Sequence, residues 1–243
     1  MSSSPGVHVM IISWVGQHQN AALIARTVSG YAEHVTIVFS DPNPGFEIDI
    51  DCERIKRPNH LFFGDKFKAC LDHCQSDLML MIHADCTCDD WVDLIRKCRN
   101  AHAQDLNIGI WSPSVSYTSF DLKITEVATI NGTSLSAVVF VDAIVWCISP
   151  SVIRRMGKVS YEDNIYGWGI SPLACAYTLT HNMMVVVDQS IAVSHPRDSG
   201  YSTVDAKNSS KDFRSQFTMM ELIQEKQRAA YMKMRSRSIS IKQ

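Results

Sequence analysis

The chain has 243 residues, of which 46% are hydrophobic, and it carries a formal net charge of −2. The length and the apolar content allow a sizeable core, and the near-neutral charge argues against a globally basic protein that binds nucleic acid. No apolar run reaches the roughly 18 residues that a membrane-spanning helix requires.

The N-terminal segment and the cysteines together indicate a cytosolic protein. Residues 1–16, MSSSPGVHVMIISWVG, hold a short apolar run with no basic segment before it, which argues against a signal peptide. The eight cysteines are scattered without paired spacing. We therefore expect reduced thiols rather than a disulfide framework.

The first part of the chain alternates between predicted strands and helices. Strands are predicted over residues 7–15 and 34–39, and the pattern between them predicts a helix over residues 20–29 that Gly30 ends. A strand, a helix and a strand within such a short span form a βαβ unit, which implies a parallel sheet. Residues 47–60 are polar and loop-like, with a possible short strand around Ile48 and Ile50.

A helix over residues 64–75 leads into the most informative stretch, DLMLMIHADCTCDDW, at residues 77–91. Its uninterrupted apolar run is typical of a strand that is buried on both faces of a parallel sheet. The run ends in His-x-Asp, and ligands of such sheets bind just beyond the carboxyl ends of the strands. This strand is therefore well placed to hold a metal-bound phosphate. Asp89 and Asp90 predict the cap of a helix over residues 91–103.

The second half of the chain predicts shorter elements and one conspicuous loop. The expected elements are a strand at 107–111, a hairpin or excursion over 114–136, a helix at 150–156, a helix at 172–182 and a strand at 183–187. Residues 137–148 are apolar except for Asp142, and YEDNIYGWGI at 161–170 forms a loop. Beyond residue 205 the chain is helical and polar. Without an internal repeat or a linker, the sequence indicates one domain and a tail.

The order of these features resembles that of glycosyltransferases of the GT-A fold, the kind grouped with family 2. The resemblance covers residues 7–206 and rests on the pieces VMIISW, HVTIVFSD, LMLMIHAD followed by TCDDW, YGWGI, and VVVDQSIAVSHPRDSGY. It implies an α/β fold with a mainly parallel, twisted, Rossmann-like sheet that is flanked by helices and has a small antiparallel excursion. The GT-A domain would span residues 1–206, and a helical basic tail would span residues 207–243.

The resemblance also implies a function: transfer of a sugar from a nucleotide-sugar, with UDP-sugars favoured, to a glycan or lipid-linked acceptor, with inversion. A divalent cation, Mn²⁺ or Mg²⁺, would neutralise the leaving diphosphate. Asp85 and His195 fall on the metal-binding positions. The first Asp of the family's motif is replaced by His83, which leaves open whether His83 touches the nucleotide, the metal or neither.

Further donor contacts follow from the same comparison. Asp41 falls where the family contacts the nucleoside, and Ser13 at the end of the first strand is placed to do the same. Arg57 and Lys66 are candidate contacts to phosphate or base. Arg197 and Tyr201, beside His195, would close over the diphosphate.

The acceptor side departs from the family pattern. Trp168 and Gly169 belong to the Gly-Trp-Gly acceptor loop, with Trp168 as a platform for a sugar ring. An inverting enzyme needs a carboxylate base, which the family places just after this loop, where Ile170 and Ser171 stand here. The candidate bases are Asp142 and Asp163, followed by Glu162. Burial beside Val141 and Ala143 would raise the pKa of Asp142.

Each of these residues also has a purely structural interpretation. Asp85 can cap a loop, His195 can be an ordinary structural histidine, Trp168 can be a buried aromatic at a tight turn, and Asp142 can bond to backbone at a strand end. A zinc site is disfavoured because the spacing fits no standard pattern. The residues that suggest it are Cys70, His73, Cys74, Cys86 and Cys88.

Two alternative functions and a possible role of the tail remain to be considered. The missing acid at Ile170 and Ser171 allows a non-catalytic GT-A protein that binds nucleotide or glycan. A nucleotidyltransferase is disfavoured because WVGQHQN, after the first strand, has one glycine and no Lys or Arg. The tail at 226–243 carries six Lys or Arg and no acid, and it can hold the protein against an anionic membrane surface.

Overall fold

The computed structural model describes residues 5–196 and 201–240, and one sheet of ten strands forms the centre of that part of the chain. The strand order is β3-β2-β1-β4-β9-β6-β10-β8-β7, and β5 pairs with β10. The strands are β1 Val7–Ser13, β2 His34–Phe39, β3 Glu53–Lys56, β4 Leu78–His83, β5 Thr87–Cys88, β6 Ile108–Ser116, β7 Glu126–Thr129, β8 Leu135–Val138, β9 Val145–Ile148 and β10 Met184–Ser194.

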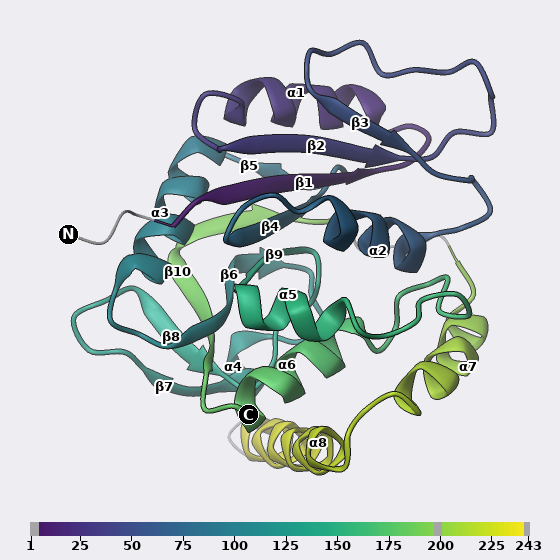
Figure 1. Cartoon of the computed structure of the whole chain (residues 1–243). Helices are drawn as coiled ribbons and strands as arrows, with labels where there is room; N and C mark the ends of the chain where they lie inside the picture. Colours follow the sequence, from purple (N-terminus) through teal and green to yellow (C-terminus); the bar gives the residue numbers. More distant parts are fainter. Residues whose placement is uncertain (1–4, 197–200, 241–243) are drawn as a thin grey trace.

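Helices cover both faces of this sheet (Figure 1). They are α1 His18–Val28, α2 Phe63–His73, α3 Trp91–Ala103, α4 Leu122–Thr125, α5 Pro150–Met156, α6 Ile170–Thr180, α7 Thr203–Arg214 and α8 Met219–Ser240. Within the described ranges, a helix of the length and apolarity needed to cross a bilayer does not occur.

Strand directions confirm the predicted α/β sheet. Strands β3, β2, β1 and β4 pair with one another in parallel, and β6 is parallel to β10. Antiparallel β9 lies between β4 and β6, and β7 and β8 form the hairpin expected within residues 114–136. The strand suggested around Ile48 and Ile50 lies instead at β3, because its backbone pairs with β2 through residues 53–56.

Alternation along β4 explains why its sequence is apolar throughout. Leu80 and Ile82 face a cluster that includes residues of α1 and α3, whereas Met79 and Met81 face a second cluster that includes residues of α2, α5 and α6. Burying each such side chain stabilises the fold by about 1.5–3 kcal/mol relative to exposure. A strand between two helical layers therefore needs a hydrophobic residue at every position.

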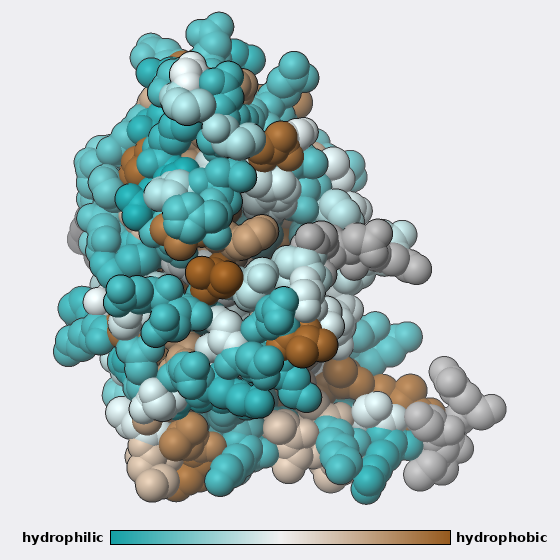
Figure 2. Space-filling model, turned by 90° about the vertical axis from the view of Figure 1, so that its right-hand side faces the viewer, coloured by the Kyte–Doolittle hydropathy of each residue, from teal (hydrophilic) through white to brown (hydrophobic). Residues whose placement is uncertain are grey.

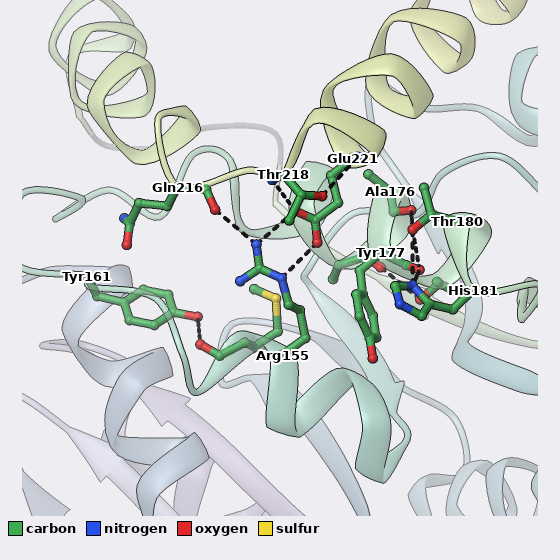
Figure 3. A network of polar contacts seen from close by, with 12 residues as sticks. Arg155, Tyr161, Ala176, Tyr177, Thr180, His181, Gln216, Thr218 and Glu221 are labelled. Atoms are coloured by element: carbon green, nitrogen blue, oxygen red, sulfur yellow. Dashed lines mark hydrogen bonds and ion pairs between the residues drawn. The ribbon is translucent and has the colours of Figure 1, made fainter.

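The C-terminal helices pack on the α6 side of the sheet. Phe213 and Phe217 belong to the hydrophobic cluster on that face. Arg155 of α5 donates to the Glu221 carboxylate at 2.7 and 2.8 Å and to the Gln216 carbonyl at 3.0 Å, as Figure 3 shows. These contacts fix the start of α8 against α5. The expected division of the chain at residue 206 into a domain and a tail stays a prediction.

A hydrogen-bonded histidine lies deep in β1. The backbone N–H of Gln75 donates to His8 Nδ1 at 3.1 Å, so His8 donates from Nε2 to the Thr36 hydroxyl at 2.8 Å. Thr36 in turn donates to Glu53 at 2.6 Å. Burial, assisted by the neighbouring His34, lowers the pKa of His8 from 6.5 to about 4. The folded protein therefore holds this imidazole neutral.

We expect this histidine to make the fold sensitive to mild acid. In the unfolded chain His8 binds a proton below about pH 6.5, whereas in the folded chain it does so only below about pH 4. The free energy of unfolding should therefore fall by about 2 kcal/mol from this group between pH 7 and pH 5. Urea titrations at both pH values measure it. His8→Gln should show a smaller fall, whereas the exposed His60→Gln should keep the wild-type fall; equal falls in all three would contradict the assignment.

Candidate functional site

The parallel strands end at one edge of the molecule, where the polar residues gather. Strands β1 and β2 run toward the right-hand side in Figure 1, and Figure 2 looks onto that side, a mostly hydrophilic surface with separate hydrophobic patches. In the β1–β4 register, Ile12 lies opposite His83. The ends of the first and fourth strands therefore meet, as expected for ligand binding at the carboxyl edge of an α/β sheet.

A short strand pairing brings two distant segments together at this edge. His83 ends β4, and Asp85 lies in the turn that follows. Strand β5 then pairs antiparallel with β10, with Thr87 opposite Ser194. Since His195 directly follows Ser194, this pairing places it beside Asp85, and its Nε2 lies 3.5 Å from the Asp85 carboxylate.

Asp85, His195 and His83 form one cluster. One potential ligand atom from each lies within 4.8 Å of the others. Trp14 and Phe63 pack against the His83 ring, with centroids 5.6 and 5.1 Å away. His83 Nε2 is buried, and among the described residues nothing hydrogen-bonds to it.

The charges of the cluster suit a cation. Burial, and then His195, lower the pKa of His83 to about 3, so the ring is neutral at physiological pH. Burial raises the pKa of Asp85, while His195 opposes the increase. A neutral imidazole with an unpartnered nitrogen, beside a partly desolvated carboxylate and a second imidazole, is a nitrogen-and-oxygen donor set that fits a divalent transition metal. The three residues thus fit the metal that the sequence implied.

The two residues expected at the nucleoside are joined by a third. His18 Nδ1 lies 2.9 Å from the Ser13 hydroxyl, and its Nε2 lies 3.1 Å from the Asp41 carboxylate. Phe46 packs on the imidazole with centroids 4.8 Å apart. His18 was not among the residues predicted from the sequence, where its only signal is an imidazole at the first position of the helix that follows β1.

The two cations expected at the donor already have protein partners. Arg57 donates two hydrogen bonds of 2.7 Å to Asp65. Lys66 is buried and donates to the carbonyls of Leu61 and Phe62, and burial lowers its pKa to about 8. Arg197 lies outside the described residues.

The Gly-Trp-Gly loop depends on both of its glycines. Gly167 and Gly169 adopt φ values of +76° and +104°, which side chains other than glycine rarely tolerate. A Cβ at Gly167 would lie 2.1 Å from Phe63, and one at Gly169 would lie 2.7 Å from Phe213. Between them, Trp168 remains 37% exposed.

An aromatic group surrounds this loop. Trp168 donates from Nε1 to the Tyr201 hydroxyl at 2.9 Å, which links the loop to the segment after His195. Tyr166 packs between Phe62 and Tyr201, with ring centroids 5.3 and 5.0 Å away. Aromatic faces of this kind suit the apolar face of a sugar ring.

Asp142 lines a cavity of about 220 Å³ at the end of β6. Burial raises the pKa of Asp142, whereas the Ala143 N–H, which donates to it at 3.0 Å, and the nearby His195 oppose this. The other two candidate bases are exposed to solvent, and the backbone carbonyl of Asp163 accepts from Ser209 at 2.7 Å. Of the three carboxylates, Asp142 is thus the one in a cavity and within electrostatic reach of the cluster.

No protein-family profile matches the chain, and no curated protein matches it in sequence. Solved structures do match. GalNAc-T7 with UDP, GalNAc and Mn²⁺ superposes with a TM-score of 0.66 at 8% identity, over 88% of this chain and 48% of that chain. The chain thus spans about half the length of this structure.

The chain covers a larger share of two other solved structures. TarS 1–349 of S. aureus gives a TM-score of 0.64 at 10% identity, over 97% of this chain and 72% of that one. The mannosyltransferase PcManGT of Pyrobaculum calidifontis, with GDP-Man and Mn²⁺, gives 0.58 at 9% identity, over 94% and 75%. At such low identity these likenesses establish the fold alone. The chain has the GT-A fold, as the resemblance in sequence implied.

Proposed function

We propose that the chain is a glycosyltransferase that uses a nucleotide-sugar and a divalent cation. The observation that carries the proposal is the cluster of His83, Asp85 and His195 at the carboxyl edge of the sheet, with a buried and unpartnered nitrogen on His83. When bound there, a divalent cation neutralises the diphosphate of the donor. The structures of GalNAc-T7 and PcManGT hold Mn²⁺ together with UDP or GDP-Man, which supports Mn²⁺ as the cation.

The nucleoside would lie between the ends of β1 and β2. There His18 holds Asp41 and Ser13 at fixed orientations through its two ring nitrogens. A carboxylate held in this way can accept hydrogen bonds from an N–H of the base or a ribose hydroxyl. A UDP-sugar is the favoured donor. Arg57 and Lys66 would contact it only by leaving their present partners, so they are weaker candidates.

The acceptor would bind on the far side of the cluster, against Trp168 and Gly169. Tyr201, which accepts a hydrogen bond from Trp168, links the acceptor loop to the segment that follows His195. Asp142 would take the proton of the acceptor hydroxyl as its oxygen attacks the anomeric carbon and the nucleoside diphosphate leaves from the opposite side, a single displacement that inverts the configuration. The acceptor would be a glycan or a lipid-linked glycan.

A second candidate function is binding without transfer. Ile170 and Ser171 are the first residues of α6 and are buried, so no acid stands where the family places its base. A GT-A protein without a base would bind nucleotide or glycan and leave the donor intact.

Donor turnover separates the two functions. We would incubate the full chain with UDP-sugars and GDP-mannose, with Mn²⁺ or with EDTA, and measure the release of nucleoside diphosphate. Release that requires Mn²⁺ supports the transferase, because even without its acceptor such an enzyme slowly passes the sugar to water. Mn²⁺-dependent binding with the donor left intact favours the binding protein. Absence of both binding and release would refute both.

Helix α8 suggests how a lipid-linked acceptor would be reached from the cytoplasmic side of a membrane. Its solvent-facing side presents Ile223 and Met234 together with Lys226, Lys233 and Arg237. Basic residues near an anionic bilayer contribute about 1 kcal/mol each. We therefore propose peripheral membrane contact through this face.

Vesicle sedimentation tests this membrane contact. The protein should sediment with vesicles that contain phosphatidylserine more than with neutral ones, and Lys226→Glu with Lys233→Glu should reduce the bound fraction by roughly tenfold or more, given two charge reversals. Changing the exposed Lys158, which lies outside α8, to Glu should leave it unaltered. Equal binding by both variants would refute the role of α8.

A further inference from the structure

A second group of metal-ligating side chains lies inside the core, apart from the cluster at the strand ends. Cys98 and His102 are one turn apart on α3, so they share a face of that helix. Cys147 reaches the same point from β9. One potential ligand atom from each of the three lies within 4.8 Å of the others. None of these three residues belongs to the group of cysteines and one histidine at 70–88 that suggests a zinc site in the sequence.

The fold separates this group from the donor site. Cys147 pairs with Leu80 of β4, three residues before His83, which corresponds to roughly 10 Å along the strand. Cys98 and Cys147 also belong to the hydrophobic cluster on the α1 and α3 face. The ring of His83 packs instead on Phe63, whose hydrophobic contacts are with the opposite cluster. The two groups of side chains are therefore separate.

The imidazole of this group has an unused ring nitrogen. His102 Nδ1 lies 3.1 Å from the carbonyl oxygen of Cys98, so Nδ1 carries the hydrogen and donates it. Nε2 is then the nitrogen with the lone pair. It is buried, and among the described residues it has no hydrogen bond of normal distance and angle, with the Cys98 thiol as its close polar neighbour. A buried acceptor without a donor costs about 1–3 kcal/mol, which a ligand to that nitrogen would offset.

The charges and the ligand types of this group favour one kind of ion. Two thiolates and a neutral imidazole around a divalent cation have no net charge, which suits a place where both sulfurs are fully buried. Sulfur and imidazole ligands favour zinc over the hard cations that prefer oxygen. With three protein ligands, a four-coordinate ion would take one water molecule as its remaining ligand.

We propose that Cys98, His102 and Cys147 bind a Zn²⁺ ion that joins α3 to β9. The ion has a structural role in this place: it links a helix of one layer to a central strand of the sheet. It is independent of the cation at Asp85, which has nitrogen and oxygen ligands and no sulfur. The proposal does not depend on the transferase activity.

Cobalt substitution tests the site in the full-length protein. We would purify the chain under reducing conditions, remove metals with a chelator and add Co²⁺. Thiolate ligands give Co²⁺ an intense near-ultraviolet charge-transfer band, whereas the ligands at Asp85 give none. We expect the band to reach its maximum at one Co²⁺ per chain and to disappear when Zn²⁺ is added.

Variants assign the band to these residues. Cys98→Ser and Cys147→Ser should abolish it, and the buried Cys175→Ser, on the opposite face of the sheet, should keep it. Asp85→Asn should keep it too, which separates this proposal from the one for the donor site.

A variant of the partly exposed His102 provides a second test if the cysteine variants fail to fold. His102→Gln should weaken Co²⁺ binding at least tenfold, and Zn²⁺ should raise its Tm less than that of the wild type. The proposal is overturned if the wild type shows no band, if the band survives loss of either thiol, or if His102→Gln binds Co²⁺ as tightly as the wild type. In each of these cases the three side chains form only a packed cluster in the core.

Discussion

Asp85→Asn is expected to abolish the strengthening of nucleotide binding by Mn²⁺. In the proposed site Asp85 is the one carboxylate among the three ligands, and its loss removes the negative charge of that ligand set. Changes to residues that merely support a ligand cost 10–100-fold in metal affinity, so loss of the ligand itself should cost more than about 100-fold. Calorimetric titration of UDP with and without Mn²⁺ measures the effect.

The same variant distinguishes a metal ligand from a structural residue. Burial raises the pKa of Asp85 above its ordinary value, so at neutral pH its charge destabilises the folded state. The neutral amide should therefore leave the Tm unchanged or raise it. Asp89→Asn, an exposed acid four residues on, is the matched control and should bind UDP with Mn²⁺ as the wild type does. A lower Tm with unchanged binding would assign Asp85 to the fold alone.

Local sequence patterns were sufficient to predict those helices and strands whose formation depends on their own residues. The apolar run of β4 and the capping aspartate at residue 90 predicted a buried strand and a helix over residues 91–103, and both are observed. Asp90 accepts a hydrogen bond from the Asp93 N–H, as a capping residue should. Such features follow from alternation and from unpaired backbone groups, which neighbouring residues determine.

Contacts between segments that are distant in the sequence could not be predicted from local patterns. The three residues of the edge cluster meet because the two residues of β5 pair with β10, and a pairing that short leaves no periodic signal. His83 looked like a departure from the motif, but its placement beside Asp85 and His195 makes it a third candidate ligand. The Cys98, His102 and Cys147 group likewise depends on how α3 packs on β9. Sequence spacing alone cannot show this.

The choice among the candidate bases also required the fold. In the sequence, Asp142 and Asp163 ranked equally as candidate bases and Glu162 ranked behind them, because each is a carboxylate near an acceptor motif. The structure places Asp142 in a cavity beside Thr118 and Phe140, while the other two are exposed. A base must be held close to the hydroxyl that it deprotonates and shielded from bulk water. This requirement favours Asp142.

Asp142→Asn should therefore lower the rate of sugar transfer by about 10²–10⁴-fold, the usual contribution of a general base. Binding of UDP with Mn²⁺ should change little, because the residue would act on the acceptor and not on the donor. Asp163→Asn is the matched control and should retain wild-type transfer. If Asp163→Asn instead loses transfer and Asp142→Asn keeps it, the base is Asp163.

The pH profile gives an independent measure of the same residue. A general base acts as the carboxylate, so the rate falls as the pH drops through its pKa. Burial raises the pKa of Asp142, which moves this fall above the pH at which an exposed aspartate would lose activity. The residual transfer of Asp142→Asn should lack the acidic fall, because an amide does not titrate in this range. A profile that keeps its acidic limb in this variant would show that another group removes the proton.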